Sequence, residues 1–227
     1  MKETSPVAAK RGRGIRAGLD LQKIVATARE IEPGQLSMQA IADVLRVDRK
    51  ALHKHVQDRE TLLGLVAHDA LADVFTAKEL AAAQDWRQAC RLYADGFVRA
   101  VVGLGALAEH LWFGEMELGV WPADSAEALL RHLADAGFSD ADGLRFVVVL
   151  TTLCLGHARD VIQYEQGGEQ DRPRQRLVKD WLAKAGTEQY PRLLRISELG
   201  LDTYGAEQLR FSVELLIRGA EPLLPDA

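Results

Sequence analysis

The chain has 227 residues, of which 48% are hydrophobic and 27% are charged. This composition excludes an intrinsically disordered protein, and the length suits one large domain or two small ones. The longest apolar runs, such as residues 146–156, are shorter than the ~20 residues that cross a bilayer, so we expect no transmembrane helix and no membrane partner. Cys90 and Cys154 form no CxxC pair, which predicts neither a disulfide framework nor a zinc site and favours the cytoplasm.

The formal net charge of −5 is unevenly distributed along the chain. Residues 1–59 hold twelve lysines and arginines against seven acidic residues, a balance of +5, and the remainder carries −10. A basic segment on an acidic body indicates a polyanionic partner for the first part only.

The first 18 residues are predicted to form a flexible basic arm. Pro6 and several glycines discourage regular structure, while Arg11, Arg13 and Arg16 concentrate positive charge. One interpretation is an arm that contacts phosphates or enters a minor groove. The other is a disordered tail that only adds solubility.

Three short helices are expected in residues 19–65. Apolar residues recur at helical spacing from Leu21 to Ala28, and Pro33-Gly34 ends that helix. Ser37 stands directly before a second periodic segment, residues 38–45, as an N-cap does. Asp48 is the expected N-cap of a third helix from Arg49 to about residue 56.

The third helix has a narrow apolar stripe and a basic opposite face. Only Leu52 and Val56 are strongly apolar, and the other side carries a polar set, Arg49, Lys50, His53, Lys54 and Gln57. A helix–turn–helix that presents such a face to the major groove is one interpretation. Two amphipathic helices within an all-helical core are the alternative.

The rest of the chain, residues 66–227, also has a helical pattern. A helix from Arg59 to about Lys78, capped by Asp58, is expected to join the basic segment to this body. Further helices are expected over residues 85–102, 124–136, 139–166 and 205–219. The middle of the long helix is apolar on nearly every face, so it is predicted to be central or to bury a partner.

An aromatic and polar set in the body is a candidate effector pocket. Its members are Tyr93, Phe97, His110, Trp112 and Phe113, with Cys154, His157 and Asp160 at three-residue spacing on the long helix. Aromatic walls with few polar groups are typical of small-molecule pockets. Ordinary core packing is the alternative for each aromatic residue.

The sequence LSMQAIADVLRVDRKALHKHVQDRETLL, residues 36–63, resembles the DNA-binding segment of TetR-family repressors without gaps. Two positions depart from the family pattern. Arg46 stands where a glycine is usual, so a non-glycine residue is expected to adopt positive φ. His53 replaces a tyrosine that contacts phosphate in the family, and histidine donates more weakly when neutral.

The resemblance continues through the body to residue 224, at Asp85-Trp86, residues 136–138, Tyr190-Pro191 and the last helix. It implies an all-α homodimer whose long and last helices form a four-helix bundle, which binds operator DNA and releases it when a small molecule fills the body. Without the resemblance, the favoured interpretation is that both helices are intramolecular core. The DNA contacts it implies are Ser37, Gln39, Arg49, Lys50, Ala51, His53, Lys54, His55 and Arg59.

The resemblance also bears on the effector and on metals. His110 and Asp160 match positions that hold magnesium in tetracycline-binding members, so they are the metal candidates, although no cofactor is predicted. Leu129 and Tyr93 stand where those members use amides to bind the drug, which favours a larger, more apolar or aromatic effector. The alternatives are an activator or a ligand-independent DNA-binding dimer, and an enzyme using Cys154, His157 and Asp160.

Overall fold

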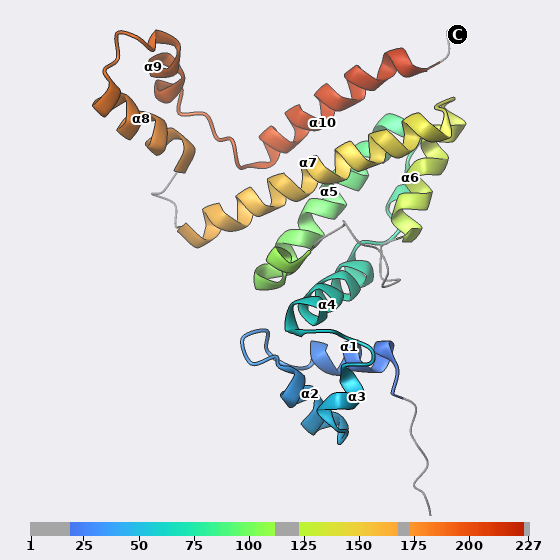
Figure 1. Cartoon of the computed structure of the whole chain (residues 1–227). Helices are drawn as coiled ribbons and strands as arrows, with labels where there is room; N and C mark the ends of the chain where they lie inside the picture. Colours follow the sequence, from blue (N-terminus) through green and yellow to red (C-terminus); the bar gives the residue numbers. More distant parts are fainter. Residues whose placement is uncertain (1–18, 112–122, 168–172, 225–227) are drawn as a thin grey trace, which may run out of the picture. The chain divides into compact units, whose positions relative to one another are not determined.

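The computed structural model describes residues 19–111, 123–167 and 173–224. Every regular element in these ranges is helical, which confirms the expected all-α fold (Figure 1). The chain divides between Leu62 and Leu63 into two compact units, which we name the head and the body. The observed division and the predicted boundary after residue 65 both fall within helix α4, Arg59–Val74.

The head contains α1 (Leu21–Arg29), α2 (Met38–Leu45) and α3 (Arg49–Leu52). Each begins at a side chain that accepts a backbone N–H: Asp20 from Lys23, Ser37 from Ala40 and Asp48 from Lys50, over 2.7–3.1 Å. The predicted caps at Ser37 and Asp48 are therefore confirmed. The apolar stripes of the helices meet in a small core of Ile24, Val25, Ala28, Leu36, Met38, Ile41, Ala42, Leu52, Val56 and Leu62.

Helix α2 ends at a residue with left-handed backbone geometry. Arg46 has φ 55° and ψ 44°, and it is the one non-glycine residue with positive φ in the described ranges. The next amide, Val47 N–H, donates to Ala42 O over 3.0 Å, closing the helix end as a Schellman-type bond does. The unusual turn expected from the sequence is confirmed.

Two helices are shorter than expected. α3 ends at Leu52 rather than near Val56, because the chain continues as turns in which His55 and Val56 both donate to Leu52 O. The expected burial of Leu52 and Val56 is nevertheless observed. α4 ends at Val74 rather than Lys78. Phe75 turns into the body core there, and its carbonyl accepts the Ser125 hydroxyl over 3.0 Å in place of a helical N–H.

The body is built around α5 (Trp86–Gly103), which packs against α6 (Ala123–Asp135), α7 (Asp140–Gly167) and α10 (Ala206–Ala220). These four helices match the predicted segments to within two residues. Asp85 caps α5 by accepting Gln88 N–H, and Gly137, with φ 103°, follows α6. The smaller elements are η1 (Leu80–Ala82), η2 (Gly105–His110), α8 (Pro173–Ala185), α9 (Pro191–Glu198) and η3 (Glu221–Leu223).

Helix α7 has far more apolar surface than the body core uses. Residues 140–165 are long and apolar enough to cross a membrane by length and composition alone, yet only 33% of the most apolar stretch is buried. The buried side, including Phe146, Leu150 and Cys154, packs in the core. The other side carries exposed apolar residues, Leu144, Val148 and Val149.

Candidate DNA-binding, dimerisation and effector surfaces

A cationic surface lies on α3 and the turn that follows it. Leu52 and Val56 are buried and anchor the segment in the head. The remaining long polar side chains are exposed, and they form what we name the α3 surface: Arg49, Lys50, His53, Lys54 and His55. Buried anchors and exposed cationic donors on one short segment are what groove recognition requires.

The other predicted DNA contacts are placed less uniformly. Ser37 is half-buried and uses its Oγ to accept Ala40 N–H at the start of α2. Gln39 is exposed and donates from Nε2 to Asp43 over 2.8 Å. Ala51 is half-buried, so its small side chain lies at the edge of the α3 surface. The arm residues Arg11, Arg13 and Arg16 lie outside the described residues.

Arg59 makes two hydrogen bonds to backbone carbonyls of the head. Its Nε donates to Leu36 O over 2.7 Å and its Nη2 donates to Pro33 O over 2.9 Å. The family pattern implied a DNA contact for Arg59, and it gave no indication of these two hydrogen bonds. Sequence spacing could not show them, because the partners lie 23 and 26 residues away.

An apolar strip runs along α7 and α10, which lie side by side (Figure 1). On α10 the buried residues Leu209, Val213 and Ile217 face the core. Phe211 and Leu215 point the other way, with 61% and 56% of their surface exposed. Leu144, Val148 and Val149 of α7 are also exposed, and we name these three with Phe211 and Leu215 the apolar strip.

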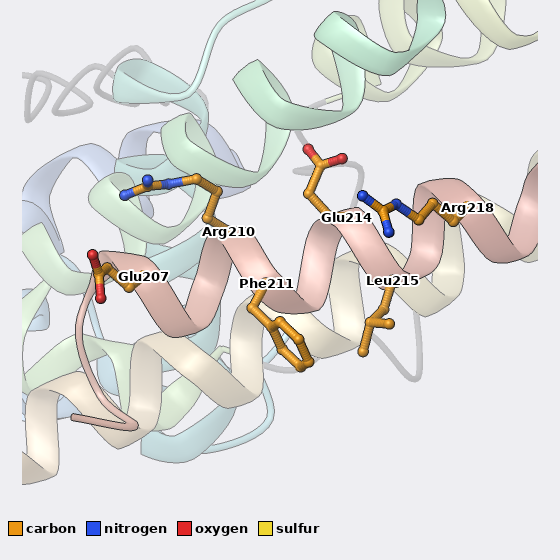
Figure 2. A pocket seen from close by; sticks show the side chains of 6 residues that line it. All are labelled: Glu207, Arg210, Phe211, Glu214, Leu215 and Arg218. Atoms are coloured by element: carbon orange, nitrogen blue, oxygen red, sulfur yellow. The ribbon is translucent and has the colours of Figure 1, made fainter. Parts of the chain in front are cut away.

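A hollow on α10 is lined by Phe211 and Leu215 of this strip and by four charged residues, Glu207, Arg210, Glu214 and Arg218. Figure 2 shows Phe211 and Leu215 on one side of the helix, and Glu214 on the other. Glu214 accepts Arg91 Nη2 of α5 over 3.1 Å, and Glu221 accepts Arg87 Nη2 of α5 over 2.8 Å. The first ion pair connects α10 to α5, and the second connects η3, which directly follows α10, to α5. Phe211 and Leu215 remain exposed.

Four predicted effector residues lie together in the body core. Tyr93, Phe97, Leu129 and Cys154 are all at most 1% exposed. Tyr93 and Phe97 stack with ring centroids 6.0 Å apart, and Phe75 meets both rings edge-on at 5.0 and 5.5 Å. The Tyr93 hydroxyl lies 2.9 Å from Thr151 Oγ1 of α7. The interior is therefore an aromatic cluster with one internal polar pair.

His110, His157 and Asp160 lie on two neighbouring elements. η2, which ends at His110, packs against both α5 and α7. Arg159 Nη2 of α7 donates to Leu111 O over 2.9 Å, so the chain just after His110 is bound to α7. His110 Nε2 lies 3.4 Å from Glu109 Oε1. Trp112 and Phe113 lie outside the described residues.

The predicted effector residues give little support to metal binding or to catalysis by Cys154. In the ranges that the structure describes, no three histidine, cysteine, aspartate or glutamate residues form a cluster suited to a metal. Burial raises the pKa of the Cys154 thiol to about 12, so the thiol stays protonated near neutral pH. A nucleophilic cysteine needs the thiolate, which argues against the enzyme alternative built on Cys154.

Phe75 and Thr151 belong to the aromatic cluster but were not among the predicted residues. Phe75 sits just past the end of a helix, where the sequence predicts a continuing one. Thr151 lies in the middle of the apolar segment of α7. The two threonines Thr151 and Thr152 interrupt the apolar run there, but spacing alone does not show that the Thr151 hydroxyl meets Tyr93.

Comparison with known proteins gives consistent matches. A sequence profile described as "Tetracyclin repressor-like, C-terminal domain" matches residues 80–223. Tetracycline repressor protein class D of Escherichia coli is 28% identical over 214 residues, covering 90% of each chain. A structure of Streptomyces coelicolor ActR in complex with actinorhodin is 22% identical over 89% of this chain and 95% of that one, with a TM-score of 0.68. A TetR variant of Acinetobacter baumannii AYE in complex with minocycline is 19% identical over 92% and 96%, with a TM-score of 0.59.

Proposed function

Because the chain belongs to the TetR family of ligand-responsive DNA-binding transcriptional regulators, we propose that it is a homodimeric repressor that a small-molecule effector releases from a near-palindromic operator. The observation that carries this proposal is the α3 surface, an exposed cationic face on a segment anchored by Leu52 and Val56. Its site of action is the cytoplasm, where it meets chromosomal DNA.

The α3 surface supplies two kinds of contact. Lys50 and Lys54 neutralise phosphates, which gives most of the affinity and makes it sensitive to salt. Arg49 and the histidines have donors long enough to reach base edges. Residues 60–227 carry a net charge of −10, so the body repels the duplex and only the heads approach it.

The apolar strip of α7 and α10 is the dimer contact. Exposed apolar side chains four residues apart on each of two adjacent helices, Leu144 and Val148 on one and Phe211 and Leu215 on the other, suit packing against the same two helices of a second copy. This also explains why α7 is more apolar than its burial within one chain requires. Two-fold symmetry then presents two α3 surfaces to successive turns of a palindromic site.

The effector is an apolar or aromatic small molecule that occupies the region of the aromatic cluster. Tyr93, Phe97 and Leu129 offer apolar contacts. A polar group of the effector could replace one partner of the hydrogen bond between the Tyr93 and Thr151 hydroxyls. Structural relatives are seen with actinorhodin and with minocycline, which supports a cyclic organic ligand for this body as well. His110 and Asp160 are the residues that would hold a metal if one accompanied the effector.

Release follows if the effector favours a conformation in which the two heads no longer fit the operator. Population shift requires only that the effector bind the non-binding conformation more tightly than the DNA-binding one. A thermal-shift screen of aromatic metabolites with the full chain would identify candidates, since a ligand that binds the folded state raises its melting temperature. A true effector must also lower DNA affinity.

The DNA-binding proposal is tested by equilibrium binding. The purified full chain selects a duplex from a random pool, and fluorescence anisotropy then measures its affinity. Lys50→Ala or Lys54→Ala is expected to weaken binding by roughly 5- to 100-fold. The matched control is Lys179→Ala, an exposed lysine of α8. Equal affinities for all three variants and the parent chain would remove the α3 surface from the mechanism.

A further inference from the structure

Arg59 links two segments of the head that are distant in the sequence. It is the first residue of α4. Its guanidinium reaches back to the turn between α1 and α2, where Nε donates to Leu36 O over 2.7 Å and Nη2 donates to Pro33 O over 2.9 Å. Leu36 comes directly before Ser37, the N-cap of α2, and Pro33 lies four residues before it.

The geometry suits the planar guanidinium of an arginine. A guanidinium presents its N–H donors in a rigid planar fork, so it can hold two acceptors at a fixed separation. A lysine ammonium is a single point at the end of a flexible stem and lacks this fork. The contact with Leu36 O is partly buried, and the Leu36 side chain is 2% exposed, so this carbonyl lies at the edge of the head core.

The backbone on either side of Arg59, at the start of α4 and in the turn after α3, is also held by hydrogen bonds. Asp58 Oδ1 accepts Thr61 N–H over 2.8 Å, which caps the first turn of α4. His53 Nδ1 lies 3.0 Å from Gln57 O, which closes the turn between the α3 surface and Arg59. The start of α2 and the end of the α3 surface are thus joined through the side chain of Arg59.

We propose that Arg59 is a positioning residue for DNA recognition: its guanidinium holds the start of α2 against the turn that follows α3 and so sets the orientation of the α3 surface. This inference rests on the proposed DNA-binding function. It replaces the expectation that Arg59 acts mainly as a phosphate contact, because two of its five N–H donors, including Nε, bind backbone carbonyls of the head.

The two roles predict opposite behaviour in two variants. A phosphate contact needs only a positive charge, so Arg59→Lys would keep the affinity, and Arg59→Gln would lower the slope of log affinity against log salt by about one per protomer. A positioning residue needs the fork. Arg59→Lys is then expected to weaken binding to the selected duplex by about tenfold or more, with less effect on a scrambled duplex and with the salt slope unchanged.

The experiment measures the full chain, Arg59→Lys, Arg59→Gln and the phosphate-contact control Lys54→Ala on both duplexes over a salt series. The proposal is supported if Arg59→Lys loses preference for the selected duplex while keeping the parent slope. It is overturned if Arg59→Lys binds like the parent chain, or if Arg59→Gln lowers the slope as Lys54→Ala does.

Amide hydrogen exchange of the same proteins without DNA separates this inference from the function it rests on. Faster exchange over residues 37–41 in Arg59→Lys, with unchanged exchange in α1, supports the connection even if no duplex is bound. Unchanged exchange over residues 37–41 overturns it. A parent chain that binds neither duplex refutes the proposed function and leaves the exchange result to decide the role of Arg59.

Discussion

Replacing Phe211 with serine tests the dimer contact quantitatively. An aromatic side chain buries 150–250 Å² when fully covered, and 61% of Phe211 is exposed in the single chain, so about 120 Å² is available to a partner. At ~25 cal/mol per Å² this corresponds to about 3 kcal/mol. A two-fold interface contains the residue twice, which gives an upper limit of about 6 kcal/mol per dimer.

Association also costs side-chain entropy, so we expect about half of that limit to be observed. The dimer dissociation constant of Phe211→Ser should therefore rise by at least about 100-fold. Sedimentation equilibrium over a concentration series measures it, and circular dichroism verifies that the helices are retained. Val74→Ser is the matched control, since Val74 is an apolar residue of α4 with 62% exposure. Identical dissociation constants for both variants and the parent would refute the assignment of the strip.

Three further outcomes are expected from urea titrations of the full chain. Arg46→Gly should raise the free energy of unfolding by about 1 kcal/mol, because glycine adopts the left-handed conformation without a Cβ penalty; an equal gain for Arg46→Ala, which keeps the Cβ, would contradict this. Tyr93→Phe should cost about 1 kcal/mol through loss of the hydrogen bond to Thr151, and adding Thr151→Val should recover part of the loss if the pair is the cause. Burial raises the pKa of the Cys154 thiol from 9.0 to about 12, so the free energy of unfolding should fall as the pH rises from 9 to 12 and should not depend on this thiol below pH 9. If the free energy of unfolding of Cys154→Ala falls as steeply with pH as that of the parent chain, the Cys154 thiol is not responsible.

Local signals in the sequence were sufficient to predict most of the helices. Ser37, Asp48 and Asp85 act as N-caps where the pattern placed them, because a short oxygen-bearing side chain before an apolar period satisfies the first free N–H groups. The left-handed turn at Arg46 followed from the resemblance to the family rather than from propensity, which disfavours arginine there.

Features that depend on distant contacts could not be predicted in this way. α4 ends at Val74, before the predicted residue 78, because Phe75 packs in the aromatic cluster with Tyr93 of α5. The Phe75 carbonyl accepts the Ser125 hydroxyl of α6 instead of a helical N–H. Arg59 reaches carbonyls 23 and 26 residues back in the chain. Periodicity reports which face of a helix is apolar, but it does not report which partner covers that face.

For the effector residues, the sequence predicted a grouping but not its internal organisation. Tyr93, Phe97, Leu129 and Cys154 do lie in one core. Whether an aromatic residue packs against its neighbours or opens to a ligand depends on volumes and rotamers that spacing does not encode. Their role as an effector site therefore stays a prediction until a ligand is bound.

The salt dependence of DNA binding tests the central claim most directly. Affinity of the full chain for its selected duplex is measured from 50 to about 300 mM salt, alongside Lys50→Ala and Lys54→Ala. We predict a steep linear fall of log affinity with log salt, a two-to-one stoichiometry of protein to duplex, and a slope reduced by about one per protomer in each variant. A shallow slope shared by all three proteins, or no preference for any duplex, would contradict DNA recognition by the α3 surface.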